Sequence, residues 1–230
     1  MRRVATVVLV LLVVLGAGFV LVDRIVVALT EDRVLAEARE WAELAPGTEV
    51  EIDGFPFLTQ VLAGRLSEIR GTAPSLVADG LELQDVRVAA RGVTPREPYR
   101  AETVEINADI PASTLRDAFG QGGLPGLPLQ VELADGLLQV GVDAGGFELD
   151  ARVEPVIVDG AVGLRLEDIS VGTADVPQEV VDLLEGALRD VRIRIPGLPD
   201  GLEPTRLAVG QDGLELRLEG KDVELGSWIG

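Results

Sequence analysis

The sequence predicts an α+β fold, in which a long antiparallel sheet with a few helices follows an N-terminal apolar segment. After Thr48, apolar residues recur at every second position over many stretches, the pattern of strands with one buried and one wet face. Asp-Gly pairs that tolerate the positive φ angles of type I′ hairpin turns separate several of these stretches. They stand at Asp79-Gly80, Asp135-Gly136, Asp159-Gly160, Asp200-Gly201 and Asp212-Gly213.

The N-terminal segment is the uncharged run from Val4 to Val22, which follows Arg2 and Arg3. As a helix it would span about 28 Å, enough to cross a bilayer. A cleaved signal peptide has a shorter apolar core and ends at a small-x-small site, whereas here the apolar run continues past Gly16-Ala17-Gly18. We therefore favour an uncleaved anchor over a signal peptide for residues 1–29. The two arginines then lie in the cytoplasm, and the rest of the chain lies on the outer face of the plasma membrane, in the periplasmic space.

Residues 30–230 are expected to form one extracytoplasmic domain. Thr30 is a suitable N-cap for an amphipathic helix that ends near Leu44, and its acidic polar face favours packing on the sheet over insertion in lipid. Further helices are predicted at Leu58–Ala63, Pro111–Phe119 and Val176–Asp190. The predicted strands are 81–92, with a bulge near Gln84-Asp85, 101–110, 128–134, 137–143, 147–158, 161–172, 191–195, 204–210 and 213–219.

Composition excludes several classes of function. The formal net charge of −19 argues against nucleic acid as a partner, because such binding depends on a cationic surface. The chain has no histidine and no cysteine, so Ser-His-Asp triads, thiol nucleophiles and zinc sites with nitrogen or sulfur ligands are absent. We expect a protein that is not an enzyme and uses no cofactor or metal. A carboxylate-based envelope hydrolase and calcium bound by scattered aspartates remain alternatives.

An unusual concentration of aromatic side chains lies at Phe55-Pro56-Phe57-Leu58, which holds two of the five phenylalanines. Proline fixes its own φ and biases the preceding residue toward an extended conformation, so the two rings should project in different directions. They could fill one end of the core or contact an apolar ligand. The candidate lipid-binding residues are Phe55, Pro56, Phe57, Leu58, Val61, Leu62 and Arg65.

Two arginines near apolar segments are candidates for holding a headgroup. Arg65 follows the predicted 58–63 helix, and Arg116 lies on the predicted 111–119 helix. A guanidinium can bind phosphate through two parallel hydrogen bonds. In a protein this acidic, the alternative for each is a surface ion pair.

The stretch GFPFLTQVLAGR (residues 54–65) resembles the actinobacterial LmeA-like family of phospholipid-binding proteins, whose name refers to lipomannan elongation. A second similarity covers Ile195–Leu225, with a Leu-Pro-x-Gly turn and a final hairpin. The resemblance implies a fold related to the tubular lipid-binding proteins, in which a long curved antiparallel sheet wraps a long helix and leaves an apolar groove. It also implies that the protein holds, presents or shuttles a phospholipid and supports assembly of cell-envelope lipoglycans.

Transfer of a lipid between such a groove and a bilayer needs no energy source. Burial of an acyl methylene is worth about 0.8 kcal/mol in either place, so the exchange is nearly balanced. An anchored protein would present lipid to a neighbouring membrane protein, such as an envelope glycosyltransferase, whereas a cleaved one could ferry it. The main alternative is a membrane-anchored acidic scaffold that binds an envelope protein and holds no ligand.

Overall fold

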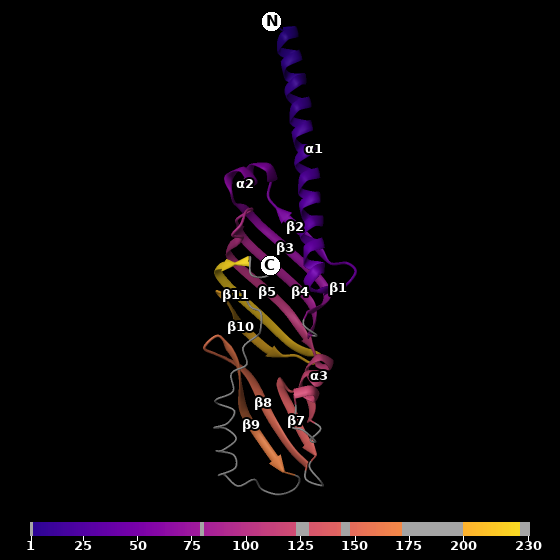
Figure 1. The fold of residues 1–230 in the computed structure, drawn as a ribbon, viewed down its shortest axis with the longest axis vertical. Coiled ribbons are helices and arrows are strands. Elements are labelled where there is room, and N and C mark those ends of the chain that lie inside the picture. Colours follow the sequence, from indigo (N-terminus) through magenta and orange to yellow (C-terminus); the bar gives the residue numbers. More distant parts are fainter. Residues whose placement is uncertain (1, 79–80, 123–128, 144–147, 172–199, 226–230) are drawn as a thin grey trace.

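The described part of the chain forms two antiparallel sheets arranged end to end, with a long N-terminal helix that projects beyond the first sheet (Figure 1). The computed structural model describes residues 2–78, 81–122, 129–143, 148–171 and 200–225. The helices within these residues are α1 (Arg2–Trp41), α2 (Phe57–Ala63) and α3 (Ala112–Gly122). The long helix and α2 lie together at one end of the first sheet, and α3 lies at its other end (Figure 1).

The first sheet has seven strands, in the order β1-β3-β4-β5-β11-β10, with β2 pairing the remaining part of β3. Its strands are β1 (Glu43–Leu44), β2 (Glu49–Asp53), β3 (Leu66–Ala78), β4 (Leu81–Val93), β5 (Arg100–Pro111), β10 (Leu202–Val209) and β11 (Gly213–Glu224). Strand β11 shows the predicted alternation, because Leu214, Leu216 and Leu218 are buried while Glu215 and Glu219 are exposed. One face of this sheet therefore supplies most of the main core cluster.

The second sheet has four strands in chain order, which makes it a simple meander. Its strands are β6 (Leu129–Ala134), β7 (Leu137–Asp143), β8 (Glu148–Val158) and β9 (Ala161–Val171). Positive φ angles occur at both residues of Asp135-Gly136 and of Asp159-Gly160, as type I′ turns require. At Asp212-Gly213 the chain instead makes a longer connection, in which the Gly210 N–H donates to the Gly213 carbonyl at 2.8 Å.

A shared core cluster joins the two sheets. It contains Leu115 of α3, Leu138 of β7, Val153 of β8 and Leu214 of β11, all buried. The prediction of one long sheet is therefore wrong in its topology, although the antiparallel α+β class is confirmed. The physical reason is that β5 leads directly into α3 and pairs with β11 along its whole length, so strands β6–β9 form a sheet of their own.

Most predicted strands match the observed ones closely, and the bulge near Gln84-Asp85 is confirmed by a register shift between Gln84 and Arg87. Asp85 there has a φ of 47°. Strand β3 was missed because Gly71 and Pro74 interrupt its alternation. The predicted helix 176–190, the strand 191–195 and the Asp79-Gly80 turn lie outside the described residues. A sheet wrapped around a long helix stays a prediction.

The predicted helix start at Thr30 is wrong, because α1 is one continuous helix through this position. The Thr30 hydroxyl donates to the Val26 carbonyl at 2.8 Å, a bond within the helix and not a cap. Within the described residues, no helix combines the length and the apolar character needed to cross a membrane. The anchor or signal segment over residues 1–29 and the single domain over residues 30–230 stay predictions.

Candidate functional site

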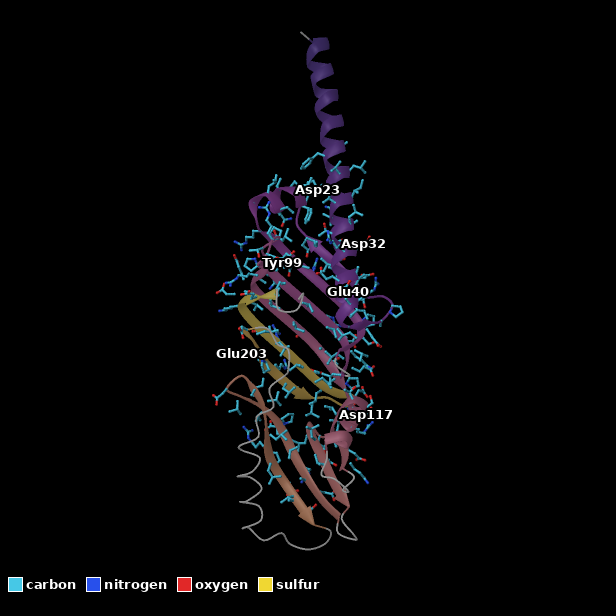
Figure 2. The ribbon with its side chains drawn as sticks, viewed as in Figure 1. Asp23, Asp32, Glu40, Tyr99, Asp117 and Glu203 are labelled. Atoms are coloured by element: carbon cyan, nitrogen blue, oxygen red, sulfur yellow. The ribbon has the colours of Figure 1, made fainter. Side chains whose placement is uncertain are left out.

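Helix α1 presents three functional side chains to the domain along one face. Asp23, Val27 and Glu31 are spaced by four residues, so successive members lie about one turn apart on the same side. Asp23 is fully buried and Val27 is buried in the main core cluster. This face attaches the helix to the first sheet at the end where α1 leaves the domain (Figure 2).

The Asp23 carboxylate caps the N-terminus of α2. The backbone N–H of Phe57 donates to Asp23 Oδ2 at 3.1 Å, and the N–H of Leu58 donates to Oδ1 at 2.8 Å. The residue at the N-cap position of α2 is Pro56, whose side chain makes no capping bond. A carboxylate from a helix 34 residues earlier in the chain therefore supplies the acceptor that Ser, Asp or Asn usually supplies locally.

Glu31 holds strand β2 in a similar way. Its Oε1 accepts a hydrogen bond from the Ile52 N–H at 2.8 Å. Among the described strands, β2 pairs only with β3, so its other edge has no strand partner there. The α1 carboxylate satisfies a backbone N–H of this strand and ties the helix to the strand that leads into α2.

Gln60 ties α2 to the strands on both sides of it. Its amide Nε2 donates to the Asp53 carbonyl at 3.2 Å, and its Oε1 accepts from the Ser67 N–H at 2.7 Å. The helix ends at Gly64, whose φ of 73° lies in the left-handed region favoured by glycine. With the Asp23 cap, these bonds fix α2 at both ends on β2 and β3.

The two rings of the Phe-Pro-Phe turn point in different directions, as predicted. Phe57 is buried in the main core cluster, with 4% of its surface exposed, whereas Phe55 is 54% exposed. The Arg24 guanidinium lies over the Phe55 ring, 5.4 Å from its centroid, a cation–π contact. Phe57 thus fills the core, the first alternative considered for these rings. Phe55 is exposed and could contact an apolar ligand, the second alternative.

The remaining candidate residues of α2 divide in the same way. Leu58 and Val61 are partly buried and pack against the core cluster. Leu62 points outward, with 83% of its surface exposed. The helix thus places two apolar side chains at the boundary between core and solvent and one beyond it.

The two candidate arginines lie far apart. Arg65 follows α2 and makes an exposed ion pair with Glu102 of β5, the alternative considered for it. Arg116 lies on α3, at the other end of the first sheet. The structure therefore does not bring them together in one headgroup site.

Titratable groups with a changed pKa lie away from α2. Burial, together with the carboxylates of Asp85 and Glu215, raises the pKa of Asp109 on β5. A hydrogen bond from Arg152 lowers the pKa of Asp168 on the second sheet. Among the described residues, no cluster of three or more possible ligand side chains is placed to hold a metal ion.

Comparison with known families gives the site a context. Residues 21–219 match the model of a family described as LmeA-like phospholipid-binding. The chain belongs to this family. The matched range includes Asp23, the Phe-Pro-Phe turn, the second sheet and the first sheet as far as the middle of β11, so the family covers the whole α1–α2 attachment. No curated protein and no solved structure matches the chain.

Sequence reasoning missed Asp23, Arg24 and Glu31. A signal was present, because Asp23 is the first acidic residue after a long uncharged run and shares a helical face with Val27 and Glu31. The sequence does not show which backbone groups these carboxylates bind, since the partners lie 34 and 21 residues away.

Proposed function

We propose that the protein holds a phospholipid by its acyl chains in an apolar groove that opens beside α2. The family match supports binding of a phospholipid, and the division of the α2 side chains supports this position. Leu58 and Val61 pack against the core at its boundary with solvent, and Phe55 and Leu62 continue this apolar surface outward. An acyl chain that enters between α2 and the core would replace contacts between Leu58 or Val61 and the core by contacts with its own methylenes.

The headgroup would lie near the cationic side chains at this end. Arg24 stacks on Phe55, and Arg65 is exposed beside Glu102. A lipid phosphate could take the place of the Glu102 carboxylate, because guanidinium binds both groups in the same planar geometry. Glu102 is exposed, so the carboxylate that this exchange releases would remain in water.

We propose the outer face of the plasma membrane as the location, with residues 1–29 as the anchor. An anchored protein would present its lipid to an envelope glycosyltransferase or another membrane protein and so support lipoglycan assembly. Because acyl burial is about equally favourable in the protein and in the bilayer, loading and release need no energy source.

The test is uptake of a fluorescent phospholipid by the purified full chain, which requires no movement of the protein between membranes. The full chain should take up the phospholipid, and Leu58→Ser should reduce uptake because the substitution places a hydroxyl at the boundary of the core. Thr59→Ser is the matched control, since Thr59 is exposed on the same helix and serine keeps the hydroxyl that donates to the Pro56 carbonyl at 2.7 Å. A folded chain that takes up no phospholipid would contradict the proposal and favour a scaffold without ligand.

A further inference from the structure

Exposed apolar side chains gather at the end of the domain that carries α2. Seven of the ten large apolar side chains that are exposed among the described residues lie on α1 between positions 19 and 25, in the Phe-Pro-Phe turn or on α2. They are Phe19, Val20, Leu21, Val22, Ile25, Phe55 and Leu62. Such a concentration on an acidic protein marks an interaction surface, which we call the docking face.

The α1 part of the docking face is apolar on all sides. Phe19, Val20, Leu21 and Val22 are consecutive, and at about 100° per residue they point in four different directions around the helix. All four are exposed, by 42% to 64%. A protein partner that contacts one side of a helix would leave the others in water, whereas lipid surrounds all of them. The next residue, Asp23, is fully buried against α2. The helix therefore passes from exposed apolar residues to the protein interior at this point.

The α2 part of the docking face lies beside this change. Leu62 follows Phe57 by five residues, about 140° further around the helix, so it points outward while Phe57 points into the core. The Phe55 ring lies next to this helix, with the Arg24 guanidinium over it. Aromatic and cationic side chains together are characteristic of the zone where headgroups meet acyl chains.

We propose that the docking face lies on a lipid bilayer, with Phe55 and Leu62 inserted at the boundary between headgroups and acyl chains and Arg24 at the level of the phosphates. The uncharged run Val4–Val22 is continuous with this face and favours a bilayer over a second protein. The net charge of −19 confines contact to this end, because an anionic surface repels the rest of the domain. Docking assigns a role to the exposed side chains whether or not the domain holds a lipid.

The chain has no cysteine, so a single introduced thiol can be labelled uniquely. The full chain carrying Leu62→Cys with an environment-sensitive fluorophore is reconstituted into phosphatidylcholine vesicles with and without lipids that bear a quencher on the acyl chain. The matched control is Asp117→Cys, an exposed position on α3 at the other end of the first sheet (Figure 2). Equal thermal unfolding of both labelled proteins checks that neither label disturbs the fold.

The proposal predicts a blue-shifted emission at position 62, quenching by the acyl-chain quencher and protection from aqueous iodide, with none of these at position 117. It is overturned if position 62 behaves like position 117. It is also overturned if energy transfer between donor- and acceptor-labelled chains at position 62 persists on dilution with excess lipid, which would identify a second copy as the occupant. A protein that docks but takes up no phospholipid would pass this test and fail the test of the proposed function.

Discussion

Replacement of Asp23 by alanine should release α2 from the domain and weaken the whole first sheet. The two hydrogen bonds to Phe57 and Leu58 are charge-assisted, and such bonds contribute about 1.5–3 kcal/mol each. The variant no longer has to bury a carboxylate, which offsets part of this loss. We therefore expect the free energy of unfolding to fall by about 2–4 kcal/mol. Because Phe57 belongs to the main core cluster, the loss should be global as well as local.

The assay is urea unfolding of the full chain in detergent, followed by circular dichroism, together with hydrogen exchange of the α2 amides. Asp32→Ala is the control, since Asp32 is exposed on the same helix and should change stability by less than about 0.5 kcal/mol (Figure 2). Asp23→Asn should fall between the two, because asparagine is also a good N-cap but offers one acceptor in place of two. If Asp23→Ala matches Asp32→Ala in both stability and exchange, α2 is held by packing alone and the Asp23 carboxylate does not hold it in place.

Three further predictions concern other parts of the domain. Asp109→Asn should raise the stability at neutral pH by about 0.2–1 kcal/mol, because Asp109 lies directly opposite Glu215 in the β5–β11 pair. The raised pKa means that the folded state holds the Asp109 proton more tightly than the unfolded state does. The stability that wild type loses relative to Asp109→Asn should therefore develop as pH rises through that pKa and vanish in acid, as pH-dependent urea unfolding would show. Gly54→Ala should lower thermal stability, because Gly54 has a φ of 101° and an added Cβ would meet the Gln60 amide. An unchanged melting temperature would mean that this turn rearranges freely. Arg65→Gln should leave stability within about 0.5 kcal/mol of wild type but reduce phospholipid uptake. The control Arg100→Gln breaks a similarly exposed ion pair, with Glu224, and should change neither stability nor uptake. Equal uptake by the two variants would mean that Arg65 does not contact the lipid.

The sequence was most informative where a pattern is local. Alternation along Gly213–Glu224 and the turns at Asp135-Gly136 and Asp159-Gly160 follow from side-chain period and positive φ, and the structure has them. The predicted strands do not include β3, because Gly71 and Pro74 remove two positions from the alternation that identifies a strand. The sequence also does not predict the separation into two sheets, since it depends on β11 returning more than a hundred residues later to pair with β5.

The candidate site was predictable only in part. The Phe-Pro-Phe sequence indicated rings that diverge, but not that Phe57 would enter the core while Phe55 remained open. The Asp23 cap joins residues that stand 34 positions apart in the chain and that no local pattern connects. Long-range contacts of this kind require the packing of α1 against β2 and α2, which periodicity does not specify.

Native mass spectrometry of the purified full chain, combined with extraction and analysis of its lipids, shows whether this chain holds a phospholipid. We expect a phospholipid in stoichiometric amount that is retained through purification or taken up from vesicles. A stable, folded protein that carries no lipid and takes up none would contradict it.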